Sequence, residues 1–455
     1  MLRASAACEA AGIPSASLTC QGFINQAKAT SIGLGFPGIP LALVPGHPGV
    51  QSKEELRRNT LEVTLDAVIS NLTTTSTQND IGQEPGARDI VYTGGAREVN
   101  RYFLEQEWSD GLPIVPPTQD LVEEFLQFTR KSSDDVLGVM LPDKRAATVW
   151  SVAVNGVMAG CRPEYMPILV ALVEAMADPD YGVEHSGNTP GSETLIILNG
   201  PIARELGFNF TQGVMRDGFQ PNTSVGRFWR LYLRNVAGFL PHKTDKGTFG
   251  NTWRVVVPEN EEVLAGIGWP SVGVDMGCKP GDNCVTIARY TGGDVLASVS
   301  GSTPEALLPY LADGVMRSMS WQLCLTMGSG YGTVRPLIML SPILAETIAK
   351  AGWSKHDVKQ YFFDHARIPA AKFELIMREW NARQVWDLAK DVAAGNLPKV
   401  FAESDDPERL VPMVFRPEDY MIAVTGDPLR TNAYVFAQNG RYGFPVVRKI
   451  ESGKA

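Results

Sequence analysis

The sequence lacks the features of several protein classes. No stretch approaches the roughly 18 consecutive apolar residues that a membrane-spanning helix needs. No basic run appears, and the formal net charge is -9. This balance argues against a nucleic-acid partner and against an anionic membrane surface. We therefore expect neither partner for this chain.

Cysteine and histidine are also scarce. Six cysteines in 455 residues are too few for a disulfide scaffold, so a reducing compartment is the simpler interpretation. The five histidines show no HxxxH or HxH spacing, which leaves an all-histidine metal site without support. Glu9 falls where the apolar part of a signal peptide would lie. We expect a cytoplasmic protein. The cofactor stays unknown, because the sequence shows no flavin-binding or metal-binding motif.

What is present is the composition of a globular chain with more than one core. Hydrophobic residues make up 44% and charged residues 20%. Residues 73–94 contain the polar, turn-rich stretch TTTSTQNDIGQEPGARD and are predicted to be a linker. We predict an α/β fold in which a small partial βα domain, residues 1–72, precedes a larger α/β layered domain, residues 95–455.

The small domain begins unusually. Residues 4–11 predict a helix that ends at Gly12, and residues 15–20 predict a strand. A later helix begins at a capping box formed by residues 52–55. Because a βα unit normally begins with a strand, this helix-first order leaves the domain without its first strand.

The large domain shows short apolar strands between amphipathic helices. This alternation predicts a layered α/β sheet. The clearest strands are 194–200, 253–260, 335–342 and 420–428, and the clearest helices are 146–160, 164–177, 222–237, 304–320 and 354–366.

One connection between two predicted helices carries candidate chemistry. In NGVMAGCRPEYMP, Cys161 and Arg162 lie between a helix ending at Gly160 and a helix beginning at Pro163. An adjacent cation and a helix N-terminus both lower a thiol pKa, which favours a nucleophile. The alternative is a buried, inert cysteine beside an Arg162 that pairs with Glu164.

Three other loops carry polar groups. Glu259 directly follows a strand, where α/β sheets place ligand groups, although a solvated acidic turn is the alternative. Cys278 and Cys284 flank a Lys-Pro-Gly-Asp turn without a second ligand pair, so we interpret a turn with incidental cysteines rather than zinc. The stretch AVTGDPLRTN would offer backbone amides and Arg430 to an anion if a helix began there.

Two features together resemble a known family. The block AGIPSASLTCQGF…LGFPGIPLALVPGHPGVQSKEELRRN resembles the back half of the UGSC domain, which is named for its selenocysteine (or cysteine)-Gly-Ser-Cys motif. More distantly, it is similar to the selenoprotein component of glycine and betaine reductases. The segments WSDGLPIVPPT, VNGVMAGCRPEY, PENEE and GWSKHDVKQYFFDHARIP resemble the large domain fused to UGSC modules in bacterial proteins. The resemblance covers most of the chain.

The sequence departs from that family at its redox motif. In the family, the motif ends a strand and opens the helix that leads into the AGIP segment. By that spacing the motif would fall just upstream of Met1, and neither Cys8 nor Cys20 stands at its position. Three explanations stay open: a selenocysteine codon read as a stop, a separate small subunit that carries the motif, or loss of the redox loop.

The resemblance implies a subunit or truncated form of a thiol- or selenol-dependent redox enzyme acting on a small molecule, of the reductase or C–X bond-cleaving type. A selenolate or thiolate would attack the substrate and a resolving cysteine would complete the cycle. The large domain would bind the substrate through Cys161, Arg162, Glu164 and Glu259, with Arg162 suited to a carboxylate.

The alternative is a non-catalytic substrate-binding or scaffold subunit. In either case the open edge of an incomplete sheet favours association with the small subunit or with further copies of the chain, as a homo-oligomer.

Overall fold

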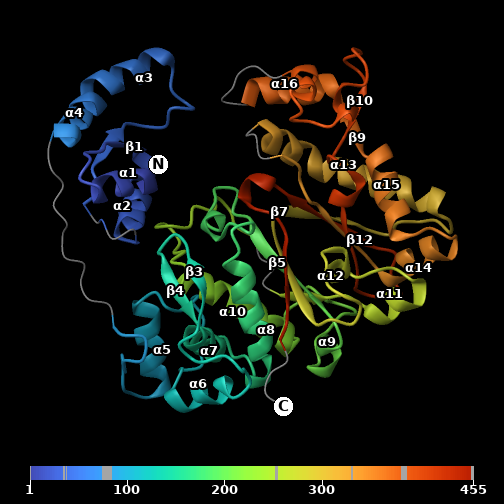
Figure 1. The fold of residues 1–455 in the computed structure, drawn as a ribbon, viewed down its shortest axis with the longest axis horizontal. Coiled ribbons are helices and arrows are strands. Elements are labelled where there is room, and N and C mark those ends of the chain that lie inside the picture. The colour runs from blue at the N-terminus through green and yellow to red at the C-terminus, as the bar shows by residue number, and fades with distance from the viewer. Residues whose placement is uncertain are drawn as a thin grey trace.

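The N-terminal elements form a small unit beside the rest of the chain (Figure 1). The computed structural model describes residues 2–33, 36, 38–73, 85–251, 255–328, 332–380 and 387–451. Half of the predicted linker, residues 74–84, lies outside the described residues. The domain boundaries given above therefore stay predictions.

The small unit alternates helices with two parallel strands. Ser17 of β1 pairs with Leu41 of β2. Gly12 has a positive φ of 71° directly after the first helix, as its predicted role at a helix end requires. The elements are α1 (Leu2–Ala10), β1 (Ser17–Cys20), α2 (Ile24–Gly33), β2 (Leu41–Val44), α3 (Lys53–Asn59), the π-helical turn Thr60–Thr64 and α4 (Leu65–Thr73).

The predicted capping box at the start of α3 is confirmed. The Glu55 N–H donates to Ser52 Oγ at 3.2 Å, and the Ser52 N–H donates to Glu55 Oε2 at 3.0 Å. Each side chain thus satisfies a backbone donor that the first helical turn leaves without an intrahelical partner.

The larger unit is built on a mixed sheet, which confirms the α/β fold class. In the part of the chain that the structure describes, the strand order is β11-β8-β12-β7-β5-β6, with β13 also paired to β7. The pairs β11/β8 and β5/β6 are parallel, and the other pairs are antiparallel. The strands are β5 (Glu193–Asn199), β6 (Val256–Pro258), β7 (Cys284–Leu296), β8 (Leu337–Leu340), β11 (Met421–Val424), β12 (Ala433–Gln438) and β13 (Val446–Lys449).

The four predicted strands appear as β5, β6, β8 and β11, and the five predicted helices appear as α7, α8, α10, α13 and α15. The helices are α5 (Ala96–Glu105), α6 (Gln119–Leu126), α7 (Val149–Met158), α8 (Met166–Met176), α9 (Ile202–Glu205), α10 (Gln220–Asn235), α11 (Glu261–Ile267), α12 (Val272–Asp275), α13 (Pro304–Gly328), α14 (Pro342–Lys350), α15 (Lys355–His365), α16 (Ala370–Trp380) and α17 (Leu388–Ala393). Two further strand pairs are β3 (Val136–Met140) with β4 (Arg145–Thr148), and β9 (Arg367–Pro369) with β10 (Leu410–Pro412).

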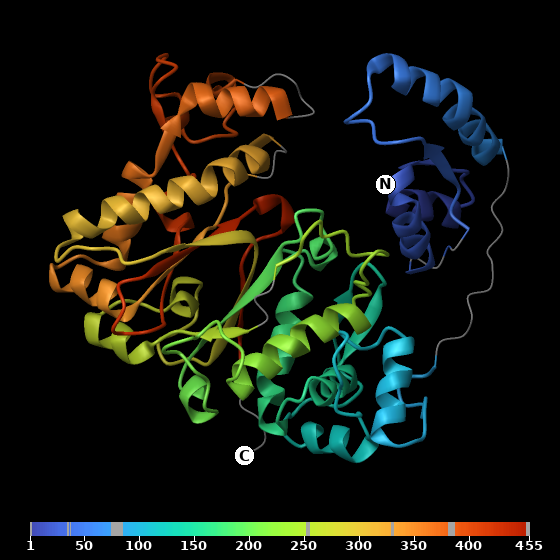
Figure 2. The ribbon, with the colours of Figure 1, turned by 180° about the vertical axis from the view of Figure 1, so that it is seen from behind.

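Side chains that alternate along the strands separate the cores on the two faces of the sheet. Ile196 and Leu198 of β5 join a core with α7, α8 and α10, whereas Leu195 and Ile197 face the opposite side. At the other end of the sheet, Ile338 of β8 packs with α13 to α16. Both views show these two helix groups gathered at opposite ends of the sheet (Figure 1, Figure 2). None of the helices described is long and apolar enough to span a membrane.

Candidate functional site

Cys161 is positioned by the way α7 ends. Gly160 has a φ of 75°, and the Cys161 N–H donates to the Gly156 carbonyl at 3.0 Å while the Gly160 N–H donates to Val157 at 2.9 Å. This pair of bonds is the Schellman motif, which turns the chain sharply after a helix. The turn leaves Cys161 half-buried between α7 and the 3-10 turn Pro163–Tyr165.

The environment of Cys161 overturns the predicted thiolate. Burial raises the pKa of Cys161 to about 12, although a hydrogen bond with Ser224 and the charge of Arg227 act in the opposite direction. Desolvation disfavours a charged thiolate, and here it outweighs one cation and one hydrogen bond. The cation that acts on this thiol is Arg227 of α10, whereas the sequence pointed to the adjacent Arg162.

The exposed Arg162 and the buried Tyr165 belong to the same cluster. Arg162 is exposed, donates to the Leu206 carbonyl at 3.2 Å, and lies with its guanidinium carbon 4.9 Å from the centroid of the Tyr165 ring. The Tyr165 hydroxyl donates to Gln220 Oε1 at 2.6 Å. Gln220 Nε2 in turn donates to the Gly160 carbonyl at 2.9 Å. These contacts join the α7 end, the 3-10 turn and the first turn of α10.

Glu164 does not form the ion pair with Arg162 that the alternative interpretation predicted. Its side chain is exposed, and the described residues place no carboxylate in ion-pair contact with Arg162. The guanidinium is therefore oriented by a carbonyl and an aromatic face, and its charge is not neutralised by a neighbour.

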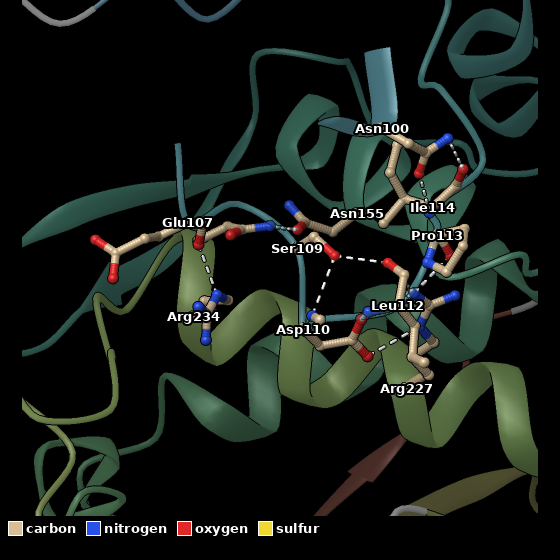
Figure 3. A network of polar contacts seen from close by, with 12 residues as sticks. Asn100, Glu107, Ser109, Asp110, Leu112, Pro113, Ile114, Asn155, Arg227 and Arg234 are labelled. Carbon is tan, nitrogen blue, oxygen red and sulfur yellow. Dashed lines mark hydrogen bonds and ion pairs between the residues drawn. The ribbon is translucent and has the colours of Figure 1, made fainter. Parts of the chain in front are cut away.

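The loop of residues 108–117 reaches the end of α7, where the Val115 N–H donates to the Met158 carbonyl at 3.4 Å. Arg227 fixes this loop (Figure 3). Arg227 donates from Nε to Asp110 Oδ2 at 3.0 Å and from Nη2 to Asp110 Oδ1 at 2.9 Å, and it also reaches the Pro113 carbonyl at 2.9 Å. Such a bidentate contact fixes the orientation of the two side chains as well as their distance. Asn100 holds the next part of the loop, because its Oδ1 accepts from the Ile114 N–H at 2.6 Å.

The contact between Asp110 and Arg227 could not be predicted from the sequence, because the two residues are 117 positions apart. Gln220 and Ser224 were missed as well, because their approach to residue 161 depends on how α10 packs against α7. Arg227 follows Ser224 by three positions on the same helix, a spacing that places both side chains on one face. That spacing indicates a polar face on the helix but does not show which residues pack against it.

Glu259 lies in a second, buried cluster at the carboxyl end of β6. Only 2% of the residue is exposed, so the solvated-turn interpretation is wrong for it. Its carboxylate accepts from the Val272 N–H at 2.6 Å, from Asn199 Nδ2 at 2.9 Å and from the Val424 N–H at 3.1 Å. The carboxylate thereby ties together the ends of β5 and β11 and the start of α12.

Burial raises the pKa of Glu259, while the charge of Lys355 and the three donors lower it. Lys355 is 2% exposed and contacts Asp275 Oδ2 at 2.9 Å. Lys359 reaches the same oxygen at 3.1 Å. Two lysines and two carboxylates thus lie together beneath the end of the sheet.

The structure therefore brings Cys161, Arg162 and Glu164 together only as neighbours along the chain, and it places Glu259 among a different set of partners. Residues 425–432 form a turn from β11 to β12, so no helix begins after Gly426, and the condition stated for an anion site there is not met. Within the described residues, no group of three or more His, Cys, Asp or Glu side chains could hold a metal ion.

Comparison with known proteins gives a family match for the N-terminal unit alone. Residues 1–74 match the model of the UGSC family, which supports a UGSC-like domain over α1 to α4. No curated protein and no solved structure matches the chain. The similarity to glycine and betaine reductases and the fusion to a large domain stay predictions.

Proposed function

We propose that this chain takes part in thiol- or selenol-dependent redox chemistry on a small molecule, with the Cys161 cluster as the substrate site of the larger unit. The observation that carries the proposal is the UGSC-family match over residues 1–74, since that family is named for a redox motif. The reaction is a reduction or the cleavage of a carbon–heteroatom bond.

The chemistry proceeds in two exchanges. A selenolate or thiolate of the family motif attacks the substrate R–X, forms a bond to R and releases X with the bonding electron pair. A second thiolate then attacks the enzyme sulfur or selenium, forms a disulfide or selenenyl sulfide, and releases R, which takes up a proton. The motif itself is not found in residues 1–455, so these steps need it from a segment outside this sequence or from a separate small subunit.

The Cys161 cluster suits a small anionic substrate. Arg162 presents an oriented guanidinium at the surface, and guanidinium forks match carboxylates in geometry and charge. Cys161 and Glu164 add a neutral thiol and an exposed carboxylate to the same junction. Glu259 contributes indirectly by holding the ends of β5 and β11 and the start of α12.

Isothermal titration with small carboxylates tests this site. We expect Arg162→Gln to weaken binding at least tenfold, about 1.4 kcal/mol, because the charge-assisted contact is lost. Arg97→Gln, which alters an exposed arginine on α5, serves as the matched control and should bind like the wild type. Equal affinities for the two variants would refute the site.

A second candidate function is a substrate-binding subunit without its own turnover. The raised pKa of Cys161 favours it, because a thiol with a pKa of about 12 is almost wholly neutral at physiological pH. Dithiol-dependent consumption of a bound ligand by the isolated chain would support the enzyme. Binding without consumption would support the subunit.

A protein partner carrying the family motif fits the surface of the N-terminal unit. Leu18 of β1 is 50% exposed, and the π-helical turn with α4 exposes a further group of apolar side chains. These are Leu61, Val63, Leu65, Ile69 and Leu72. Native mass spectrometry of gently purified material should show a complex heavier than the 49.5-kDa chain. A mass of one chain alone would contradict this partner and a homo-oligomer alike.

A further inference from the structure

Cys278 and Cys284 meet at the start of β7, although they were interpreted from the sequence as incidental. Both are free thiols. Cys278 is half-buried, and Cys284, the first residue of β7, is buried. The two thiol groups lie within hydrogen-bonding reach of each other. Two neighbouring thiols of unequal exposure are the starting arrangement for thiol–disulfide exchange.

The turn between the two cysteines holds them in this position. The Asp282 N–H donates to the Lys279 carbonyl at 3.0 Å, and the Lys279 N–H donates to Asp282 Oδ2 at 3.0 Å. Lys449 Nζ of β13 contacts Asp282 Oδ1 at 2.6 Å. The loop is therefore closed by its own hydrogen bonds and anchored to the sheet.

Gly273 makes room for the buried sulfur. A Cβ atom at this position would lie 2.3 Å from Cys284 Sγ, so only glycine allows the sulfur to sit against the α12 backbone. The Gly273 N–H donates to Asn199 Oδ1 at 3.0 Å, and its carbonyl accepts from the Cys278 N–H at 2.9 Å. The same residue thus contacts Cys284 and holds the backbone of Cys278.

The two cysteines differ in a way that assigns their roles. Burial raises the pKa of Cys284, and Cys278, Glu261 and Glu259 raise it further. Cys284 is therefore a protonated, shielded thiol. Cys278 is the one that an incoming disulfide can reach, because its side chain is partly exposed.

We propose that Cys278 and Cys284 are a redox-active pair that interconverts between dithiol and disulfide by exchange with a low-molecular-weight disulfide. The Cys278 thiolate attacks one sulfur of RSSR, forms a mixed disulfide and releases RS⁻. Cys284 then gives up its proton and attacks the Cys278 sulfur, which releases the second RS⁻. The two protons from the cysteines end on the two released thiolates, so one RSSR is reduced to two RSH.

This pair does not rest on the function proposed above, because its test requires no turnover. It is also distinct from a metal site, since the described residues supply no third His, Cys, Asp or Glu ligand to the two sulfurs.

Exposure of the reduced, full-length protein to a series of glutathione redox buffers tests the pair. After quenching with acid, alkylation and digestion, mass spectrometry follows the peptide that contains both cysteines. We expect this peptide to lose both alkylation sites together and to lack the two thiol hydrogens, while Cys161 stays alkylatable after denaturation. Dithiothreitol should restore both thiols. Absence of the intramolecular disulfide at every ratio, or pairing of Cys278 with a different cysteine, would overturn the proposal.

Single variants separate the two roles. Cys284→Ser should trap glutathione on Cys278, because the resolving thiol is missing, and Cys278→Ser should leave Cys284 unmodified in the folded protein. Cys161→Ser is the matched control and should form the disulfide as the wild type does. Equal glutathionylation of Cys284 in the Cys278→Ser protein would contradict the assigned order. The measurement on the wild-type protein does not depend on the variants, so it still tests the proposal if a variant fails to fold.

Discussion

At the scale of single residues, burial sets the state of each candidate group more strongly than its neighbours along the chain. Cys161 has an adjacent arginine in sequence, yet its pKa is raised because the thiol is desolvated. Glu259 follows a strand in an acidic stretch, yet it is shielded from solvent and accepts three hydrogen bonds. Sequence patterns supply the residue types, whereas packing decides whether they are charged.

The raised pKa of Cys161 predicts slow alkylation at neutral pH. We expect the rate with iodoacetamide to keep rising beyond about pH 10 in the folded protein, and to level off near about pH 8.5 in denaturant. Because the unfolded chain loses this proton first, the free energy of unfolding should also fall as pH rises above about 9. Site-specific mass spectrometry measures the rates. A plateau near neutral pH in the folded protein would contradict the raised pKa.

Replacing Glu259 by glutamine should destabilise the protein. The amide can accept from some of the three donors, but its NH2 group would face another donor, so a buried N–H loses its partner. Such a loss costs roughly 1–3 kcal/mol. Urea unfolding measures the change. Glu262→Gln, at an exposed position paired with Arg204, is the control and should change the free energy by less than about 0.5 kcal/mol. Equal midpoints for the two variants would show that the Glu259 contacts contribute nothing.

At the scale of elements, the sequence predicted strands and helices with uninterrupted apolar patterns and missed the central strand. β7 contains Gly292 and Gly293, which are typical of a turn. In the structure, a Cβ at Gly293 would lie 2.2 Å from the Tyr434 ring, and the register between β7 and β12 shifts beside Gly292. Gly292 therefore lies beside a bulge in β7, and Gly293 makes room for an aromatic ring of the neighbouring strand β12.

The end of α7 offers a test of how an element positions a site residue. Gly160→Ala should cost about 1 kcal/mol, because a φ of 75° is unfavourable for a residue with a Cβ. It should also weaken ligand binding, since Cys161 and Arg162 follow directly. Gly266→Ala is the opposite case, because Gly266 lies inside α11 with open space around it and alanine favours helix. We expect thermal unfolding to occur at a lower temperature for the first variant and at a higher temperature for the second.

At the scale of the whole molecule, the two units differ greatly in the size of their cores. The clusters of the larger unit run from Phe103 to Ile450, whereas among the described residues the cluster in the small unit has Ala6 and Ile39 as its buried members. Lys246 of the larger unit touches the small one, with Nζ 3.4 Å from the Gly22 carbonyl and 5.5 Å from the centroid of the Phe23 ring. A small core and a slight contact give the small unit little stability of its own.

This difference predicts separate opening of the two units in hydrogen exchange. The amides of β1 and β2 should exchange at least about a hundredfold faster than those of β5 and β7, which corresponds to about 3 kcal/mol less opening free energy. Strands β5 and β7 lie inside a sheet with cores on both faces, whereas β1 has a half-exposed Leu18 and pairs only with β2 in the described chain. A partner that completes the small sheet would slow exchange in β1 and leave β5 and β7 unchanged. If the amides of all four strands exchange equally slowly in the isolated chain, the small unit is stable without a partner. Its low stability would then no longer support a docked subunit.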